Sequence, residues 1–246
     1  MVHSGAGPSG LVAAKSLLHD VPSGTFDVSI FDSQPRVGGL WPSSKHDAAG
    51  LLHPLMVANQ SKHTMQFSDL AWEDGVSEFP RAWQVGRYLE RYSQAYCHGA
   101  TLCLGTRVEK TEPLPGPNQG WLVRACSQGG KAQEHTFDYL LVASGIFSKP
   151  FAPPTATSDT AIPVLHSSQY RDLSSLLGTS KGDGGKILVV GGQMSGVEVA
   201  GTIAAHISSA IHAPGPSSIQ NADKYSVHHV TPKPAWVFPL FTSPKV

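Results

Sequence analysis

Residues 1–19, MVHSGAGPSGLVAAKSLLH, contain the pattern Gly-x-Gly-x-x-Gly at positions 5–10. From Pro8 onward, apolar residues recur with the spacing of one helix face, and proline is favoured in a first helical turn. Residues 26–32, FDVSIFD, then predict a buried strand that ends in an acid. A glycine turn, a helix and a second strand are the parts of a βαβ unit that binds dinucleotides.

The glycines of this turn have separate tasks in such a unit. We predict that Gly5 makes the tight turn, that Gly7 lets a pyrophosphate approach, and that Gly10 lets the helix pack closely. The N–H groups and the dipole of a helix N-terminus attract the phosphates. Asp32 stands where an acid accepts hydrogen bonds from the ribose hydroxyls. The alternative is a purely structural turn, in which Asp32 caps the loop that follows.

The same design recurs at residues 186–207, KILVVGGQMSGVEVAGTIAAHI, with SVHHV at 226–230 as the second strand. We predict that this turn binds a second dinucleotide through Gly191, Gly192, Ser195 and Gly196. Gln193, however, stands where Gly7 stands in the first copy, and its side chain is expected to hinder a phosphate. The alternative is a unit that keeps the shape and binds weakly.

The region between the two copies predicts one long helix and several short strands. Residues 81–99 are amphipathic, and Gly99 is expected to end the helix. The runs TLCLG, TRVEKTE, GWLVRAC and TFDYLLVASG follow, and we interpret them as a small β-meander inserted in the first unit. The proline-rich segment 148–163 predicts a linker. The predicted fold class is α/β with two Rossmann-like dinucleotide-binding units (three-layer ββα), in domains 1–160 and 161–246.

Composition excludes several other classes of function. The 246 residues carry 18 basic and 18 acidic side chains, so no electrostatic argument favours nucleic acid or an acidic membrane surface. No apolar run is long enough to span a membrane. Cys97, Cys103 and Cys126 form no C-x-x-C pair, and the histidines form no metal motif, so we predict neither a redox dithiol nor a metal site. The cysteine usage favours an intracellular, cytoplasmic location.

Several separate segments resemble the flavin-containing monooxygenases. GAGPSGLVAAKSL, FDSQPRVGGLW, MVANQSKHTMQFSD and FPRAWQVGRYLERYS occur in that family's order and at similar spacing, as do LLVASGIFSKPFAPP, HSSQYRD and VVGGQMSGVEVA. The resemblance spans nearly the whole chain. It is closest to the fungal branch, which has a GGxxSG second turn.

This resemblance implies an enzyme with two cofactors, FAD and NADPH, and a small-molecule substrate. In the family, FAD lies in the first domain and NADPH in a second domain inserted within it. Such an enzyme uses O2 to oxygenate soft nitrogen or sulfur nucleophiles through a flavin C4a-hydroperoxide, as N,N-dimethylaniline monooxygenase does. The chemistry belongs to the cofactor, so the protein supplies position and exclusion of water.

The resemblance also assigns cofactor-binding residues one by one. The ADP half of FAD would be held by Gly5, Gly7, Pro8, Ser9, Gly10 and Asp32. The rest of the dinucleotide would run along Gly39, Leu40 and Trp41, although Trp41 has the alternative of a plain core aromatic. Val108 would lie by the adenine, and Ser144 with Gly145 would make a second contact to FAD.

Two more residues have both a functional and a structural interpretation. Asn59 matches the family's asparagine near the reacting edge of flavin and nicotinamide, and its alternative is a loop cap. Lys233 is placed to meet the 2′-phosphate of NADPH, and its alternative is an ordinary surface lysine.

His166 matches the His-Ser-x-x-Tyr core of the family's identifying motif, although Thr160 and Ile162 replace the usual Phe and Gly. Its alternative is a hydrogen-bonded linker histidine. Tyr170-Arg171 stands where Baeyer–Villiger relatives have Trp-Pro, which favours the branch that oxygenates nitrogen and sulfur.

The sequence departs from the family at both ends. Family chains are much longer, and Met1–Ser4 stands where they have five or six aliphatic residues of a central strand. We expect a shortened first strand, in which unpaired polar atoms of His3 and Ser4 cost about 1–3 kcal/mol each. We also expect the FAD domain to lack its C-terminal return. The alternative function is therefore a catalytically inactive fragment that keeps the fold and weak nucleotide or partner binding. A disulfide reductase with two dinucleotide domains is disfavoured by the missing C-x-x-C.

Overall fold

The computed structural model describes residues 1–47, 50–116, 120–147, 149–151, 162–178, 183–217 and 219–233. The chain divides into two compact units, Met1–Ser148 and Lys149–Val246, which are treated separately below. The predicted domain boundary after residue 160 and most of the predicted linker lie outside the described residues.

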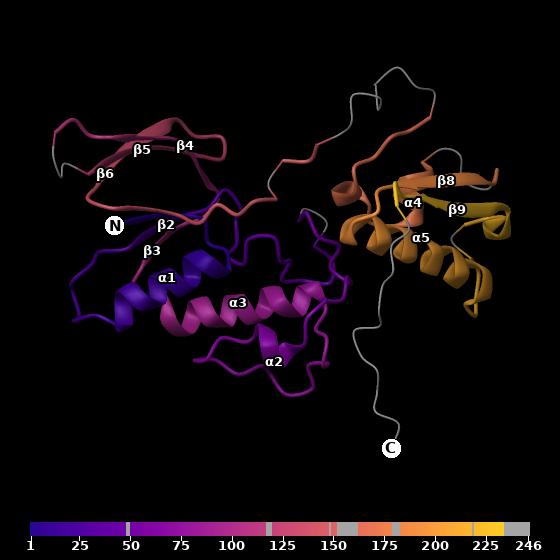
Figure 1. The fold of residues 1–246 in the computed structure, drawn as a ribbon, viewed down its shortest axis with the longest axis horizontal. Coiled ribbons are helices and arrows are strands. Elements are labelled where there is room, and N and C mark those ends of the chain that lie inside the picture. Colours follow the sequence, from indigo (N-terminus) through magenta and orange to yellow (C-terminus); the bar gives the residue numbers. More distant parts are fainter. Residues whose placement is uncertain are drawn as a thin grey trace. The chain divides into compact units, whose positions relative to one another are not determined.

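The first unit is built on a four-stranded parallel sheet (Figure 1). Its strands are β1 (Val2–Ser4), β2 (Ser29–Phe31), β3 (Thr101–Cys103) and β7 (Leu140–Val142), in the order β3-β2-β1-β7. The first strand is short, as expected, but it lies inside the sheet and pairs with a neighbour on both edges. Each pairing in this sheet joins three residues with three, so β1 matches its neighbours in length. The side chain of His3 lies outside the described part of the chain.

A separate antiparallel meander is present, but its predicted membership was partly wrong. The meander consists of β4 (Thr106–Pro113), β5 (Trp121–Ser127) and β6 (Ala132–Phe137). Residues 101–103 of the run TLCLG and residues 140–142 of the run TFDYLLVASG pair in the parallel sheet instead. Of β6, only Thr136 and Phe137 lie in a predicted run. The physical reason is that a short apolar run has no periodicity that separates a parallel from an antiparallel partner.

Three layers follow from the alternation of side chains along the strands. Ile30 is fully buried and packs with residues of helices α1 (Pro8–His19) and α3 (Ala82–Tyr96). The adjacent Phe31 points to the other face and packs with Val2 and with Val123 of the meander. Helices therefore cover one face of the parallel sheet and the meander covers the other (Figure 1), which confirms the predicted three-layer ββα arrangement.

Helix α3 buries the face that its sequence predicts, including Val85, Leu89 and Tyr92. It ends at Tyr96 rather than at Gly99, because Cys97 already leaves the helical conformation and donates its N–H to the carbonyl of Ser93. A one-turn helix, α2 (Lys62–Met65), lies in the loop-rich segment before α3.

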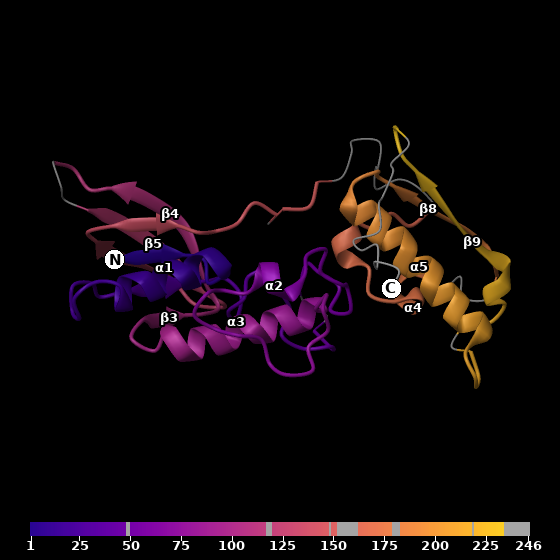
Figure 2. The same ribbon diagram turned by 60° about the horizontal axis from the view of Figure 1, so that its bottom comes forward.

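The second unit repeats the predicted strand, turn, helix and strand. The strands β8 (Gly185–Val190) and β9 (Tyr225–Val230) pair in parallel, and α5 (Met194–His212) lies along one face of them (Figure 2). Ile203 and Ile207 of α5 pack against Ile187 and Val189 of β8. Three short helices complete the unit: η1 (Ser167–Gln169), α4 (Leu173–Leu177) and η2 (Ala222–Lys224). Within the described ranges, no helix combines the length and apolar character that a bilayer crossing needs.

Two glycines inside helices offer a matched test of this packing. A Cβ on Gly86 of α3 would lie 2.2 Å from the carbonyl oxygen of Pro42, whereas one on Gly201 of α5 would meet nothing within 4 Å. We expect Gly86→Ala to lower the free energy of unfolding by about 1–3 kcal/mol, because backbone must move to admit the methyl group. Gly201→Ala should raise it by up to about 1 kcal/mol through helix propensity.

Urea unfolding followed by tryptophan fluorescence reports the first unit, which contains four of the chain's five tryptophans. Circular dichroism follows α5 in the second unit. A Gly86→Ala protein as stable as the parent would contradict the close contact of α3 with Pro42.

Candidate functional site

The first glycine turn lies at the carboxyl end of β1, where two of its glycines are enforced by backbone contacts. Gly5 has a φ of +117°, and a Cβ on it would lie 2.2 Å from the carbonyl oxygen of Ala143. A Cβ on Gly10 would lie 2.0 Å from the carbonyl oxygen of Gly5. These two positions make the turn tight and bring α1 against it, so glycine is needed here with or without a ligand.

Gly7 is different, because the protein itself does not require glycine there. It is the N-cap of α1 with φ −77° and ψ −176°, an extended conformation open to any residue. A Cβ on it would meet only the Cα of Gly39, at an ordinary contact distance of 3.7 Å. No side chain caps α1. The place that a Cβ at Gly7 would take thus lies at the N-terminus of α1, and the dipole of a helix N-terminus suits a pyrophosphate.

The carboxylate of Asp32 bonds to the backbone of two loops. Its Oδ2 accepts a hydrogen bond from the N–H of Ala6 at 2.7 Å, and its Oδ1 accepts one from the N–H of Gln34 at 2.8 Å. These bonds match the structural interpretation of Asp32. Each carboxylate oxygen still has a second acceptor direction, so the bonds also fix the carboxylate beside the turn for a ribose hydroxyl.

The loop that contains Gly39, Leu40 and Trp41 forms a second wall against the turn. The N–H of Gly38 donates to the carbonyl of Ala6 at 2.8 Å. A Cβ on Gly39 would lie 3.1 Å from the Cα of Gly7, so the two glycine stretches touch through backbone. Trp41 packs against the core between α1 and α3, as its structural alternative predicts, and Leu40 beside it is half-buried.

Ser144 reaches the same turn from the end of β7, whereas Gly145 is exposed and a Cβ on it would meet nothing within 4 Å. The N–H of the preceding Ala143 donates to the carbonyl of Ser4 at 2.8 Å, which brings the Ala143 carbonyl against Gly5. The backbone nitrogen of Ser144 lies 3.2 Å from the place where a Cβ on Gly5 would stand. Ala143 is a site residue that the sequence interpretation missed, because its strand had been assigned to the meander.

The structure does not bring Val108 and Asn59 to this turn. Val108 lies in β4 next to a β-bulge and packs between the meander and the parallel sheet. Asn59 is exposed between α2 and the bridge that pairs Val57 with Arg81. Its side chain makes no hydrogen bond to the described residues, so the loop-cap alternative gains no support.

The second turn has the same backbone as the first and different side chains. Gln193 is the N-cap of α5 with φ −88° and ψ 174°, close to the angles of Gly7, and its side chain is exposed. A Cβ on Gly196 would lie 2.0 Å from the carbonyl oxygen of Gly191. This is the same distance as between a Cβ on Gly10 and the carbonyl oxygen of Gly5 in the first turn. The turn has therefore not shifted to make room, and Gln193 carries a side chain at the position where the first turn has none. Ser195 is exposed in the first turn of α5.

Strand register identifies the counterpart of Asp32 in the second unit. Ser4 pairs with Phe31 in the first sheet, and Val190 pairs with Val230 in the second. The residues that follow are Gly5 with Asp32 in one unit and Gly191 with Thr231 in the other. Thr231 lies against the turn, since a Cβ on Gly192 would be 3.0 Å from its Cβ. The acid is thus replaced by a neutral residue, and the exposed Lys233 follows two positions later.

His166 and Cys97 have structural surroundings and lie apart from the glycine turns in the sequence. His166 caps η1, and its Nδ1 lies 2.9 Å from Oγ of Ser168, as expected for a hydrogen-bonded linker histidine. The three cysteines are free, and burial raises the pKa of the Cys97 thiol to about 11, which makes it unreactive. In the part of the chain that the structure describes, no three His, Cys, Asp or Glu side chains are placed to hold a metal ion.

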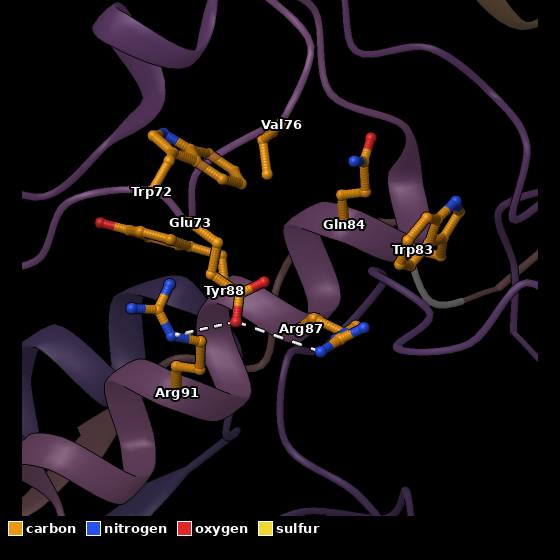
Figure 3. A pocket seen from close by; sticks show the side chains of 8 residues that line it. All are labelled: Trp72, Glu73, Val76, Trp83, Gln84, Arg87, Tyr88 and Arg91. Atoms are coloured by element: carbon orange, nitrogen blue, oxygen red, sulfur yellow. Dashed lines mark ion pairs between the residues drawn. The ribbon is translucent and has the colours of Figure 1, made fainter.

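A hollow of about 40 Å³ lies elsewhere in the first unit, between α3 and residues 72–76 (Figure 3). Trp72, Trp83 and Tyr88 form part of its wall. Glu73 lies 3.5 Å from Nε of Arg91 and 4.0 Å from Nη2 of Arg87 (Figure 3). Its volume is far below the roughly 300–1,000 Å³ of a pocket that binds a small-molecule ligand. None of the predicted cofactor-binding residues lines it, so it is separate from the glycine turns.

Comparisons with known proteins agree with this geometry. Monooxygenase ptmN of Penicillium ochrochloron is 31% identical over 199 residues, which cover 80% of this chain and 31% of ptmN. Thiol-specific monooxygenase of Saccharomyces cerevisiae is 29% identical over 152 residues, 61% of this chain and 34% of the relative. The chain thus spans about a third of the length of these curated relatives.

Among solved structures, S-allyl-L-cysteine S-oxygenase from Allium sativum shares the fold with a TM-score of 0.64 at 21% identity. The match covers 92% of this chain and 55% of that one.

The profile of one protein family matches residues 2–213. The family is described as FMO-like, flavin-binding monooxygenase-like. The solved structure of one neighbour, OTEMO, at 17% identity, is a complex with FAD and NADP. Because the family profile matches most of the chain, the family expected from the resemblance is confirmed: the chain belongs to the flavin-binding monooxygenases.

Proposed function

We propose that the chain binds FAD at the first glycine turn and NADPH at the second, as part of a flavin-dependent monooxygenase. In this proposal residues 1–160 form the FAD domain and residues 161–246 the NADPH domain. The observation that carries it is the space at Gly7, since the fold alone would admit a side chain there. The cytoplasmic location predicted from cysteine usage belongs to the proposal and is compatible with three free cysteines.

Each wall of the first site has a separate task toward FAD. The turn at residues 5–10 would hold the pyrophosphate on the N-terminus of α1, together with Pro8 and Ser9. Asp32, already fixed by two backbone N–H groups, would accept hydrogen bonds from the ribose. Gly39 and Ser144 would close the site from two further loops. When bound, the flavin supplies electrons from NADPH and activates O2 for transfer of one oxygen atom to the substrate.

We propose a small molecule with a soft nitrogen or sulfur nucleophile as the substrate. The name of the thiol-specific relative from yeast supports the sulfur side of this choice. Asn59 is assigned to the reacting edge of the cofactors, and its exposed amide is available for that task.

The pair Thr231 and Lys233 supports NADPH rather than NADH at the second turn. A carboxylate at the end of the second strand accepts hydrogen bonds from both ribose hydroxyls and repels a 2′-phosphate. The register places Thr231 at this position, so the second unit lacks that repulsion. Lys233 would add a positive charge nearby.

A second candidate function rests on Gln193. Its exposed side chain stands beside the helix N-terminus that would receive the NADPH pyrophosphate. The chain would then bind FAD and keep the fold, but bind NADPH too weakly to reduce the flavin. This candidate is a specific case of the catalytically inactive fragment described above, in which weak NADPH binding is the cause of inactivity.

FAD binding is the first experiment that separates these functions. We expect the purified chain to show visible flavin absorbance and to melt at a higher temperature with added FAD. FAD at one hundred times its Kd should stabilise the chain by about 2.7 kcal/mol. Anaerobic NADPH should then bleach the flavin. Bleaching by dithionite but not by NADPH would favour the second candidate, and a chain that takes up no FAD would contradict both.

Exchanging the residues at the two N-caps tests the role of Gly7. We expect Gly7→Gln to weaken FAD binding at least tenfold, or about 1.4 kcal/mol, because the side chain fills the space for the pyrophosphate. Gln193→Gly should strengthen NADPH binding and leave FAD binding unchanged. Titrations followed by flavin and nicotinamide fluorescence measure both. Equal FAD affinity of Gly7→Gln and the parent would place the pyrophosphate elsewhere.

The preference of the chain for NADPH over NADH tests the roles of Thr231 and Lys233, which follow β9. We expect Thr231→Asp and Lys233→Met each to weaken NADPH binding about fivefold to tenfold, roughly 1–1.4 kcal/mol. NADH binding should change little in Lys233→Met and should strengthen in Thr231→Asp, because the new carboxylate can accept hydrogen bonds from the ribose hydroxyls. The effect of Lys233→Met should shrink at high salt, since it arises from an exposed charge. If NADPH and NADH lose affinity equally, neither residue reads the 2′-phosphate.

A further inference from the structure

Arg36 lies at the centre of the loop that forms the second wall of the first site. Its Nη1 donates hydrogen bonds to the carbonyl oxygens of Val37, Gly39 and Trp41, at 3.3, 3.3 and 2.6 Å. Its Nε lies 3.1 Å from Oδ2 of Asp47. The side chains of Arg36 and Asp47 are only 16% and 14% exposed. One guanidinium therefore gathers three carbonyls of a five-residue loop and is neutralised by a single acid.

This arrangement has an energetic consequence for residues 37–41. Without Arg36, three carbonyl oxygens in a partly buried place would lose their shared donor, and Asp47 would lose its counter-ion. The loop would then open toward water to solvate these groups. Gly38 and Gly50 pack around the guanidinium, since a Cβ on either would lie within 3.7 Å of its nitrogens. The loop is thus closely fitted around this one side chain.

The loop that Arg36 holds is in direct contact with the glycine turn. Gly38 donates to Ala6, and Gly39 touches Gly7 through backbone atoms. These contacts lie within one or two residues of the carbonyls that Arg36 holds. Movement of the loop would therefore alter the space beside Gly7, although Arg36 itself lies outside the turn.

We propose that Arg36 is the positioning residue of the cofactor site: it holds residues 37–41 in the shape that keeps Gly39 against Gly7. This inference rests on the proposed function, in which FAD occupies the space beside Gly7. Lysine is a poor substitute, because one ammonium group cannot donate from both the Nε and the Nη1 positions of arginine. Arg36→Lys should therefore rescue only part of the effect.

The test compares Arg36→Met with Arg36→Lys and with the control Lys15→Met. Lys15 is 17% exposed, pairs with Asp20 at 3.0 Å and with Asp69 at 3.4 Å, and contacts neither loop. We expect Arg36→Met to raise the Kd for FAD at least tenfold and Arg36→Lys to give an intermediate value. Lys15→Met should lower the melting temperature without changing the Kd, which separates positioning from general stability.

Amide hydrogen exchange without FAD gives a second readout. Peptides that cover residues 5–10 and 37–41 should exchange faster in Arg36→Met than in the parent or in Lys15→Met. Unchanged exchange in both peptides would overturn the inference. A parent that binds FAD with the same Kd as Arg36→Met would overturn it too and leave the proposed function intact. A parent that binds no FAD would overturn the proposed function and the role of Arg36 toward FAD.

Discussion

The close contact between a helix and the carbonyl of the first glycine in its turn is the constraint on which both units depend. In each unit a Cβ at the last glycine of the turn, Gly10 or Gly196, would lie 2.0 Å from that carbonyl. Helix and strand can approach this closely only when both residues lack a side chain. The contact fixes where the helix N-terminus points. In both units it lies at the carboxyl end of the strand that precedes the turn, β1 or β8, and open α/β sheets bind their ligands at the carboxyl ends of their strands.

Identical backbones in the two units carry different chemistry. Gly7 and Gln193 have nearly the same dihedral angles, and Asp32 and Thr231 have the same position relative to their strands. The first unit has no side chain at its helix N-cap and an acid fixed beside the turn, and in the proposed function it takes FAD. The second has a glutamine at its N-cap, a neutral strand end and a lysine, and in the proposed function it takes NADPH and binds the pyrophosphate more weakly.

The first site is assembled from segments that are distant in the sequence. The loop at residues 36–41 and residues 143–144, which follow β7, both contact the turn at residues 5–10 through backbone atoms. Arg36 organises the middle segment through its carbonyls, and the β7 ladder places the last one. Backbone contacts of this kind tolerate little displacement, because carbonyl and Cα atoms cannot rotate away as side chains do.

The sequence by itself determined the fold class, the two βαβ units, helix α1 and the buried face of α3. These features depend on local periodicity and on glycine spacing, which neighbouring residues decide. Only the tertiary structure decided the partners of the short strands β3 and β7, because the sequence of a three-residue strand does not specify which strand it pairs with.

The same limit hid Ala143 and Arg36, whose roles come from residues far away in the chain. It also left open which glycines of the first turn the fold itself needs. Glycine is required at position 5 by the carbonyl of Ala143 and at position 10 by the carbonyl of Gly5, whereas the fold does not require it at position 7. That distinction arises from distances between packed segments, which a sequence does not contain.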